Sequence, residues 1–314
     1  MSREYKQSEV VIKKKFEDRY RSLLGERYDE FISCSISFLR RAIRVNTIKS
    51  DVNFVVSRLS KSWEVKQVPW CKEGFWIQGD RRDIGNLLEH QMGYIYVQEP
   101  ASMIPPIVLE PKPKDIVLDM ASAPGSKTTQ ISAMMKNKGI IVANDENPLR
   151  LKLLAMNLQR CGVENAVISN RNAMYFEKAN ILFDKILLDA PCSGTGTIRK
   201  SLKTLKIWNE KMTLKIAGLQ KRLLDSAYAS LKRGGVLVYS TCSLEPEENE
   251  ENVSWFLDKY KDMFSVEINL DIKQDKPIME FEGKKYNKGV KNCLRLYPHT
   301  NDTQGFFVCK MIKR

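Results

Sequence analysis

Short apolar runs alternate with amphipathic segments along the last two thirds of the chain. Runs of apolar and β-branched residues predict strands, and apolar residues that recur every three or four positions predict helices. This alternation predicts an α/β fold in which helices cover both faces of a mostly parallel sheet, with an antiparallel strand near the end of the chain. We expect strands at residues 116–119, 139–143, 166–169, 183–189, 235–240, 264–268 and 305–312, and helices at residues 126–135, 148–160, 212–231 and 247–260.

The first 95 residues follow a different pattern. Amphipathic segments of mixed charge between residues 9 and 41 predict two helices, interrupted near Gly25. A small α/β module follows, with strands expected at 42–48, 63–68 and 74–77 and a helix at 51–59. We therefore divide the chain into a helical segment (1–40), a small α/β module (41–95) and a large α/β domain (96–314).

The chain is strongly basic, with 51 Lys and Arg residues against 38 Asp and Glu residues and a formal charge of +13. This balance favours a polyanionic partner such as nucleic acid, although a basic surface that serves only solubility gives the same count. The sequence contains no apolar run long enough to span a bilayer, and its first residues lack the apolar segment of a signal peptide. We expect a cytoplasmic, monomeric protein without a membrane segment.

Seven cysteines are scattered along the chain without a CxxC pair, and there are only two histidines. This distribution argues against a disulfide framework and against a zinc site, so we expect no metal. Free cysteines are usually small buried residues. We expect burial for five of them: Cys34, Cys71, Cys161, Cys293 and Cys309.

Basic and aromatic residues are interleaved in the small module. They are Arg40, Arg41, Arg44, Trp63, Trp70, Phe75 and Trp76. Such mixing can serve single-stranded RNA, because bases stack on rings and phosphates meet cations. A module this small also needs its rings as a core. We favour the core for the rings, and the arginines stay open between RNA contact and structure.

Reactive side chains follow two of the apolar runs. Asp189 and Cys192 come at the end of the strand expected at 183–189, and Cys242 follows the strand expected at 235–240. The carboxyl ends of parallel strands meet at one edge of a sheet, where ligands bind in open α/β folds. Each thiol taken alone is also consistent with a buried core cysteine. The two strand ends together predict a site with two thiols and a carboxylate.

A cofactor pocket is predicted at the same edge. The strand at 116–119 ends in a turn containing Pro124 and Gly125, which lets the backbone approach a ligand closely before the next helix begins. The turn matches neither the phosphate-binding loop nor the dinucleotide fingerprint. Asp145 follows the next strand, where an acid accepts hydrogen bonds from ribose hydroxyls, although an acid there also serves as a helix cap. A site with a ribose-binding acid but no phosphate-binding loop suits a nucleoside that carries no pyrophosphate. S-adenosylmethionine is such a cofactor.

Two segments resemble a known family. They are Asp-Ala-Pro-Cys-Ser-Gly-Thr-Gly at 189–196 and Ser-Thr-Cys-Ser-Leu-Glu-Pro-Glu-Glu-Asn-Glu at 240–250, with flanking signatures at 44–47, 102–106, 295–299 and 305–307. From Arg44 to its end the chain resembles the Nop/Sun-type RNA cytosine-5 methyltransferases, and its compact length is similar to that of archaeal tRNA members. The resemblance implies a Rossmann-like, seven-stranded, mostly parallel methyltransferase sheet, preceded by an RNA-recognition-like module and N-terminal helices.

The resemblance also implies roles for individual residues. Cys242 would add to C6 of cytosine, and Cys192 would act in product release. Asp189 would hydrogen-bond the cytosine edge, and Lys127 would contact the substrate and help to lower a thiol pKa. The implied cofactor is S-adenosylmethionine. Its expected binding residues are Ala121, Ser122, Ala123, Pro124, Gly125, Ser126, Lys127, Asp145, Arg150, Asn172 and Asp189.

The sequence departs from the family pattern at several positions. Ala121, Ser122 and Ser126 stand where Cys, Ala and Gly are usual, and Asn172 stands where the family usually has an acid. We interpret the chain as an S-adenosylmethionine-dependent RNA cytosine-5 methyltransferase, with tRNA favoured over ribosomal RNA. The alternatives are an RNA-binding relative without turnover and an enzyme acting on DNA cytosine, which would use Cys192 as its nucleophile.

Overall fold

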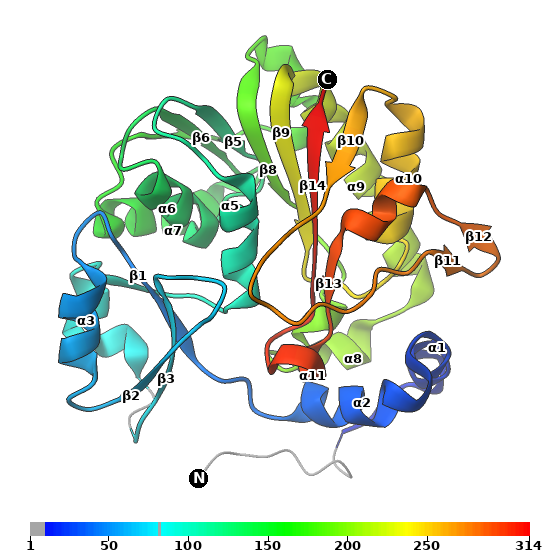
Figure 1. Cartoon of the computed structure of the whole chain (residues 1–314), viewed down its shortest axis with the longest axis horizontal. Coiled ribbons are helices and arrows are strands. Elements are labelled where there is room, and N and C mark those ends of the chain that lie inside the picture. Colours follow the sequence, from blue (N-terminus) through cyan, green and yellow to red (C-terminus); the bar gives the residue numbers. More distant parts are fainter. Residues whose placement is uncertain (1–9, 81–82) are drawn as a thin grey trace.

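The expected strands assemble into one large sheet in the computed structural model, which describes residues 10–80 and 83–314 (Figure 1). The strand order is β10-β14-β9-β8-β5-β6-β7, and β13 also pairs with β14. The central strands β7, β6, β5, β8 and β9 run parallel, whereas β14 is antiparallel to its neighbours. The bounds are β5 Ile116–Asp119, β6 Ile140–Asn144, β7 Ala166–Ser169, β8 Phe183–Asp189, β9 Leu231–Thr241, β10 Met263–Val266, β13 Leu294–Leu296 and β14 Phe306–Lys313.

Helices cover both faces of this sheet, as the alternation predicted. On one face, Leu224 and Phe256 from α9 and α10 pack with Ile186 and Leu188 of β8. On the other face, α5 and α6 pack against the intervening residue, Leu187. The side chains of β8 therefore alternate between two apolar layers, as in a buried strand. The helices are α5 Ile104–Leu109, α6 Ser126–Met134, α7 Pro148–Cys161, α8 Lys203–Ile207, α9 Glu210–Ser230, α10 Glu250–Lys259 and α11 Pro298–Asn301.

Two local differences bear on the site. The helix expected from residue 247 begins at Glu250, and residues 246–249 form a turn instead. The short strand β13 was not predicted, nor was the hairpin of β11 (Glu280–Phe281) and β12 (Lys284–Lys285). These strands have only two or three residues each, which is too short for a periodic signal.

The small module forms an antiparallel sheet of order β2-β3-β1-β4, packed with α3 (Val52–Leu59) and α4 (Leu88–Gln91). Its strands are β1 Ala42–Val45, β2 Glu64–Gln67, β3 Gly74–Gln78 and β4 Ile95–Val97. The last strand, β4, was not predicted, and it continues two residues beyond the module boundary expected at 95. All four rings are buried. Trp63 and Phe75 belong to the core of the module, as expected, whereas Trp70 and Trp76 pack in the apolar cluster of the large domain.

Arg44 is not available to RNA, which corrects one of the two interpretations left open for it. Its side chain is 1% exposed, its Nε donates to Gln98 Oε1 at 2.8 Å, and its NH2 group donates to Thr129 Oγ1 at 2.8 Å. Because Thr129 lies on α6, Arg44 joins the small module to the large sheet. Arg40 lies over the ring of Trp76, 4.2 Å from its centroid.

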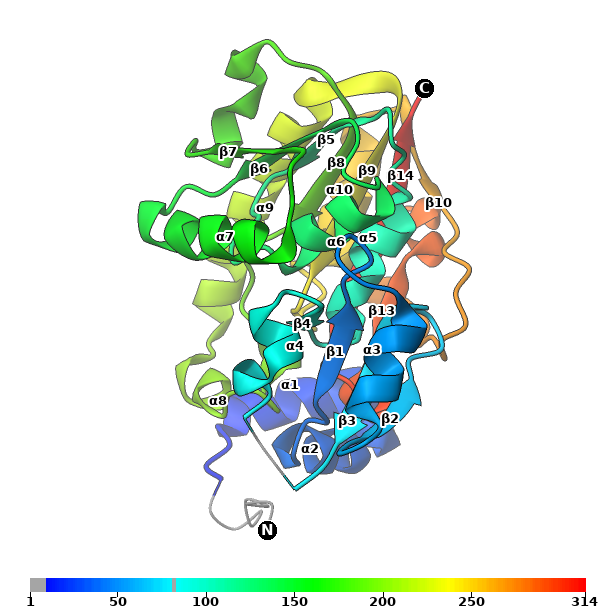
Figure 2. The same cartoon turned by 90° about the vertical axis from the view of Figure 1, so that its left-hand side faces the viewer.

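The N-terminal helices α1 (Lys14–Leu24) and α2 (Tyr28–Ile36) lie near the carboxyl ends of the parallel strands (Figures 1 and 2). They meet at Gly25, whose φ of 56° ends the first helix where a turn was expected. Phe16 and Tyr20 of α1 share an apolar cluster with Trp208 and Leu244. None of the helices within 10–80 and 83–314 is long and apolar enough to span a membrane.

Candidate active site

Strand pairing brings the two cysteine segments together. β8 and β9 are parallel neighbours in which Asp189 is in register with Ser240, so the loops after them emerge side by side. Cys192 Sγ lies 3.0 Å from Cys242 Sγ, and both residues are half-buried. Gly196 N donates to Cys242 O at 2.9 Å, which fastens one loop to the other. The structure therefore unites the two thiols that the sequence placed at separate strand ends.

Asp189 and Lys127 form an ion pair beside the thiols. Lys127 extends from the first turn of α6, and its Nζ lies 2.6 Å from Asp189 Oδ2 and 3.0 Å from Ser102 Oγ. Ser240 Oγ donates to Asp189 Oδ1 at 2.7 Å. Burial opposes the charged form of Lys127, but the contact with Asp189 outweighs it and raises the pKa of Lys127. The pair thus keeps a fixed positive and a fixed negative group at the site.

The two thiols lie within hydrogen-bonding distance, and either sulfur can be the donor. The hydrogen bond to Cys242, together with burial, raises the pKa of the Cys192 thiol well above its ordinary value. This direction favours the protonated form of Cys192, which can donate a hydrogen bond toward Cys242 Sγ. Hydrogen bonding to a thiolate stabilises it, and the thiolate is the nucleophilic form of cysteine.

Two buried carboxylate oxygens accept no hydrogen bond among the described residues: Asp119 Oδ1 at the end of β5 and Asp145 Oδ2 just after β6. Asp145 Oδ2 forms an ion pair with Arg150 NH1 at 3.1 Å, and Asp145 Oδ1 accepts from Asn147 N at 3.0 Å. Buried acceptors without donors are costly unless a ligand supplies the donors. Ribose hydroxyls and an ammonium group are such donors, so these residues fit S-adenosylmethionine.

The backbone of the loop after β5 also suits close approach of a ligand. Gly125 has a φ of 106°, and a Cβ there would lie 3.0 Å from Leu154 Cδ1. Ser122 Oγ donates to Asn144 O at 2.9 Å, and an Arg150 NH2 group donates to Ala123 O at 2.5 Å. The loop from Ala121 to Ser126 is thereby held against β6 and α7. Ala121, Pro124 and Ser126 make no side-chain contact that fixes their role toward the cofactor.

Asn172 lies on the rim of this region and is exposed. Its Oδ1 accepts from Met174 N at 3.0 Å, so the oxygen caps the short 3-10 helix that follows. Only its amide nitrogen is left to face a ligand.

The sequence interpretation overlooked groups that support the site. Glu245, the third residue after Cys242, accepts hydrogen bonds from Tyr20 OH and Trp208 Nε1 at 2.8 and 2.9 Å, and it pairs with Arg19 Nε at 2.8 Å. Helix α1 therefore fastens the segment behind Cys242. No local pattern in residues 1–40 indicated this contact, because its partners lie more than 180 residues away in sequence.

Four of the five cysteines expected to be core residues are buried, and Cys34 is half-buried. The described residues contain no group of three His, Cys, Asp or Glu side chains able to hold a metal ion.

Comparison with known proteins agrees with this geometry. The family model for 16S rRNA methyltransferase RsmB/F matches residues 106–312, and the model for the N-terminal domain of 16S rRNA methyltransferase RsmF matches residues 12–100. The tRNA (cytosine(49)-C(5))-methyltransferase of Pyrococcus abyssi is 42% identical over 311 residues, which cover 99% of each chain.

Two further relatives extend the comparison. The ribosomal RNA small subunit methyltransferase F of Vibrio atlanticus is 40% identical over 312 residues, which cover 97% of this chain but 64% of that protein. The crystal structure of NSun6 from Pyrococcus horikoshii with SFG superposes with a TM-score of 0.85 at 27% identity, covering 96% of this chain and 98% of that one. The expected family and the Rossmann-like fold are thereby confirmed. This chain belongs to the RsmB/F family of methyltransferases.

Proposed function

We propose that this protein transfers a methyl group from S-adenosylmethionine to C5 of a cytosine in RNA, with tRNA as the favoured substrate. The observation that carries the proposal is the placement of two thiols 3.0 Å apart beside the Lys127–Asp189 pair. The end-to-end similarity to an archaeal tRNA cytosine-5 methyltransferase supports tRNA. SFG, present in the related NSun6 structure, is an analogue of S-adenosylmethionine and supports the cofactor.

Cytosine C5 is a poor nucleophile, and a thiolate overcomes this by covalent catalysis. The Cys242 sulfur forms a bond to C6, and the electron pair of the C5–C6 double bond moves onto C5 and toward N3. Asp189 would hydrogen-bond the cytosine edge and help to hold a proton at N3, so that the negative charge developing there is neutralised. Lys127 would contact the substrate beside it. After C5 is methylated, a base removes the C5 proton. The electron pair of that C–H bond re-forms the double bond, and the pair of the S–C6 bond returns to Cys242.

The cofactor supplies the electrophilic methyl group when it is bound. Asp145 and Arg150 would hold its ribose end, and the backbone from Ala121 to Ser126 would line its amino-acid end. Asp119 Oδ1, which accepts no hydrogen bond among the described residues, would accept from the ammonium group. Asp145 Oδ2 accepts no hydrogen bond besides its ion pair with Arg150, which leaves it able to accept from a ribose hydroxyl.

A lysine-lined groove supports RNA as the partner. Four lysines, Lys13, Lys14, Lys15 and Lys211, line a hollow of about 490 Å³ between the start of α1 and the start of α9, together with one carboxylate, Glu210. We call this hollow the lysine groove. Three exposed lysines lie beyond it: Lys203, Lys206 and Lys215. Helix α8, which carries two of them, follows the Cys192 loop in sequence, so the positive charge lies on elements attached to the site. Such a surface suits phosphates.

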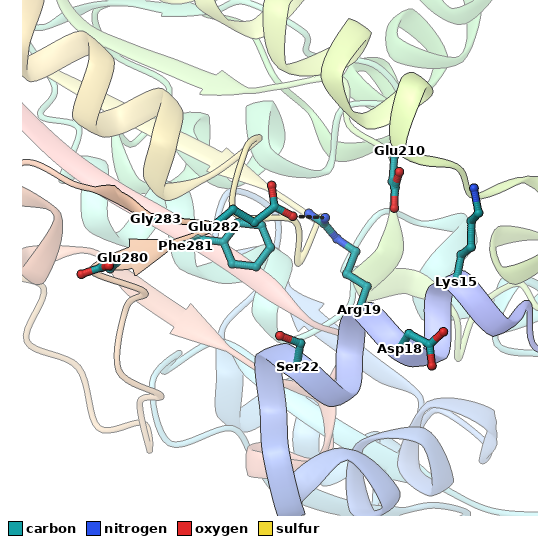
Figure 3. Close-up of a pocket in the computed structure, with 9 residues that line it drawn as sticks. All are labelled: Lys15, Asp18, Arg19, Ser22, Glu210, Glu280, Phe281, Glu282 and Gly283. Carbon is teal, nitrogen blue, oxygen red and sulfur yellow. Dashed lines mark ion pairs between the residues drawn. The ribbon is translucent and has the colours of Figure 1, made fainter.

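The neighbouring hollow limits this surface on one side. A space of about 700 Å³ between α1 and the β11–β12 hairpin is lined by Asp18, Glu210, Glu280 and Glu282 as well as Lys15 and Arg19 (Figure 3). Figure 3 shows Lys15 at the end of this hollow, next to Glu210. Four carboxylates disfavour a phosphate backbone there. RNA is therefore expected along the lysine groove and α8, and not across the hairpin.

The experiment is methyl transfer by the purified chain to tRNA and to ribosomal RNA transcripts, followed by mapping of 5-methylcytosine. We expect the modification in tRNA. Transfer to ribosomal RNA alone would favour the alternative supported by the similarity to rRNA methyltransferase F. Transfer to DNA cytosine, or binding of RNA without any transfer, would overturn the proposal.

A further inference from the structure

The two cysteine loops share one buried carboxylate. Glu248 is fully buried in the turn before α10. Its Oε2 accepts from Ser193 N at 3.0 Å, and its Oε1 accepts from Ser243 Oγ at 2.8 Å. Ser193 directly follows Cys192, and Ser243 directly follows Cys242. One side chain therefore binds the neighbour of each thiol.

Other contacts complete this connection. Ser193 Oγ and Ser243 Oγ lie 3.0 Å apart. Gln220 of α9 donates from Nε2 to both Glu248 Oε2 and Pro191 O, each at 2.9 Å. Pro191 precedes Cys192, so the Cys192 loop is held on both sides of the thiol. A buried network in which each polar group has a partner permits little movement.

We propose that Glu248 is a positioning residue that sets the separation of the Cys192 and Cys242 thiols. It does not touch the reacting atoms, and it acts through Ser193 and Ser243. The consequence for catalysis rests on the proposed function, in which one thiol attacks and the other acts in release. An ordinary helix cap does not explain the contacts, because both bonds reach the residue next to a thiol and one of them crosses to the other strand end.

The first test measures thiol placement without RNA or cofactor. Diamide oxidises two adjacent thiols to a disulfide and is itself reduced to the hydrazine, so the rate reports how close the sulfurs are. We expect Glu248→Ala to slow formation of the Cys192–Cys242 disulfide by about 10-fold to 100-fold. Glu248→Gln should retain the wild-type rate, because its amide oxygen accepts from Ser193 N and its amide nitrogen donates to Ser243 Oγ.

The matched control is Glu247→Ala. Glu247 is the adjacent carboxylate, but it pairs with Arg19 and not with a cysteine loop. Ser243→Ala provides a second variant in case Glu248→Ala does not fold, since it removes the same connection from the Cys242 side. It should slow disulfide formation as well. Wild-type rates of disulfide formation in Glu248→Ala and Ser243→Ala would overturn the proposal.

The second test separates positioning from binding. In methyl transfer, Glu248→Ala should lower kcat by about 10-fold to 100-fold while KM for RNA stays within about twofold, and Glu248→Gln should restore kcat. A rise in KM with kcat unchanged would contradict a positioning role. If the wild-type protein methylates no RNA, the proposed function fails, but the disulfide rates still decide whether Glu248 sets the thiol separation.

Discussion

Lys127 Nζ lies 2.6 Å from Asp189 Oδ2, between the cofactor loop and the two cysteine loops. This ion pair connects the start of α6 to the end of β8, and its side chains are 11% and 26% exposed. Removing one partner leaves the other charge partly buried and unpaired, which is costlier than the pair itself. The pair is therefore expected to matter for both the shape and the charge of the site.

We predict that Lys127→Met lowers kcat for methyl transfer by about 100-fold or more, because Asp189 loses its counter-charge and its orientation. Lys138→Met, which changes an exposed lysine, is the control and should leave kcat unchanged. Single-turnover kinetics on the same RNA measure the effect. Equal rates for the two variants would show that Lys127 serves only the fold.

Cys192→Ala should accumulate a covalent protein–RNA complex that survives denaturant, because Cys242 still attacks while release is impaired. Cys242→Ala should form no such complex and show no turnover. Electrophoresis under denaturing conditions distinguishes the two, with Cys34→Ala as the control. Unimpaired release by Cys192→Ala would remove the role assigned to that thiol.

Burial raises the pKa of Asp119 to about 7, whereas the carboxyl of an unfolded chain titrates near 3.9. Between about pH 4 and pH 7 the folded chain holds a proton at Asp119 that the unfolded chain has released. The free energy of unfolding therefore falls as pH rises, by about 1.4 kcal/mol per pH unit for this one group. The stabilising contribution of the protonated Asp119 carboxyl to the free energy of unfolding is fully present below about pH 4 and is lost as pH rises through about 7.

Asp119→Asn should remove this dependence. Urea unfolding of both proteins at pH 5, 6, 7 and 8, without cofactor, measures it. The stability of the wild type relative to the variant should fall between pH 5 and pH 7 and then level off. Asp271→Asn, at an exposed position, should show no such trend. A constant difference between wild type and Asp119→Asn at all four values would contradict the raised pKa.

The lysines of α8 and of the lysine groove predict a specific dependence of tRNA affinity on salt concentration. Replacing Lys203, Lys206 and Lys211 together by Gln should weaken tRNA binding and reduce the slope of log Kd against log salt by about 2, since each lost phosphate contact removes roughly 0.7 to 0.9. The control replaces Lys284, Lys285 and Lys288, which are exposed on the far side of the acidic hollow. Transfer to a short single-stranded RNA should be less affected than transfer to tRNA. Identical slopes for both triple variants would exclude Lys211 and the lysines of α8 as RNA contacts.

The local sequence pattern predicted the large sheet well because most of its strands are short apolar runs. Reactive side chains directly follow two of these runs. The pattern also placed Cys192 and Cys242 at strand ends. That β8 and β9 are neighbours, and that their thiols lie 3.0 Å apart, depends on pairing between distant segments. A local pattern carries no information on such pairing.

The remaining differences have the same origin. The interleaving of basic and aromatic residues leaves Arg44 open as an RNA contact in the sequence, yet its acceptors lie on Gln98 and Thr129. Glu248 falls within the helix predicted at residues 247–260, which begins at Glu250 instead. Its partners Ser193 and Gln220 are distant in sequence, and they hold it in a turn.

The central claim is that the Cys242 sulfur attacks C6 of a cytosine in RNA. The most direct measurement uses RNA in which the target cytosine is replaced by 5-fluorocytosine, because fluorine at C5 is not removed as a proton is and the covalent complex persists. After digestion, mass spectrometry identifies the modified peptide. The account predicts the nucleotide on Cys242. A nucleotide on Cys192, or methylated product without any covalent complex, would contradict it.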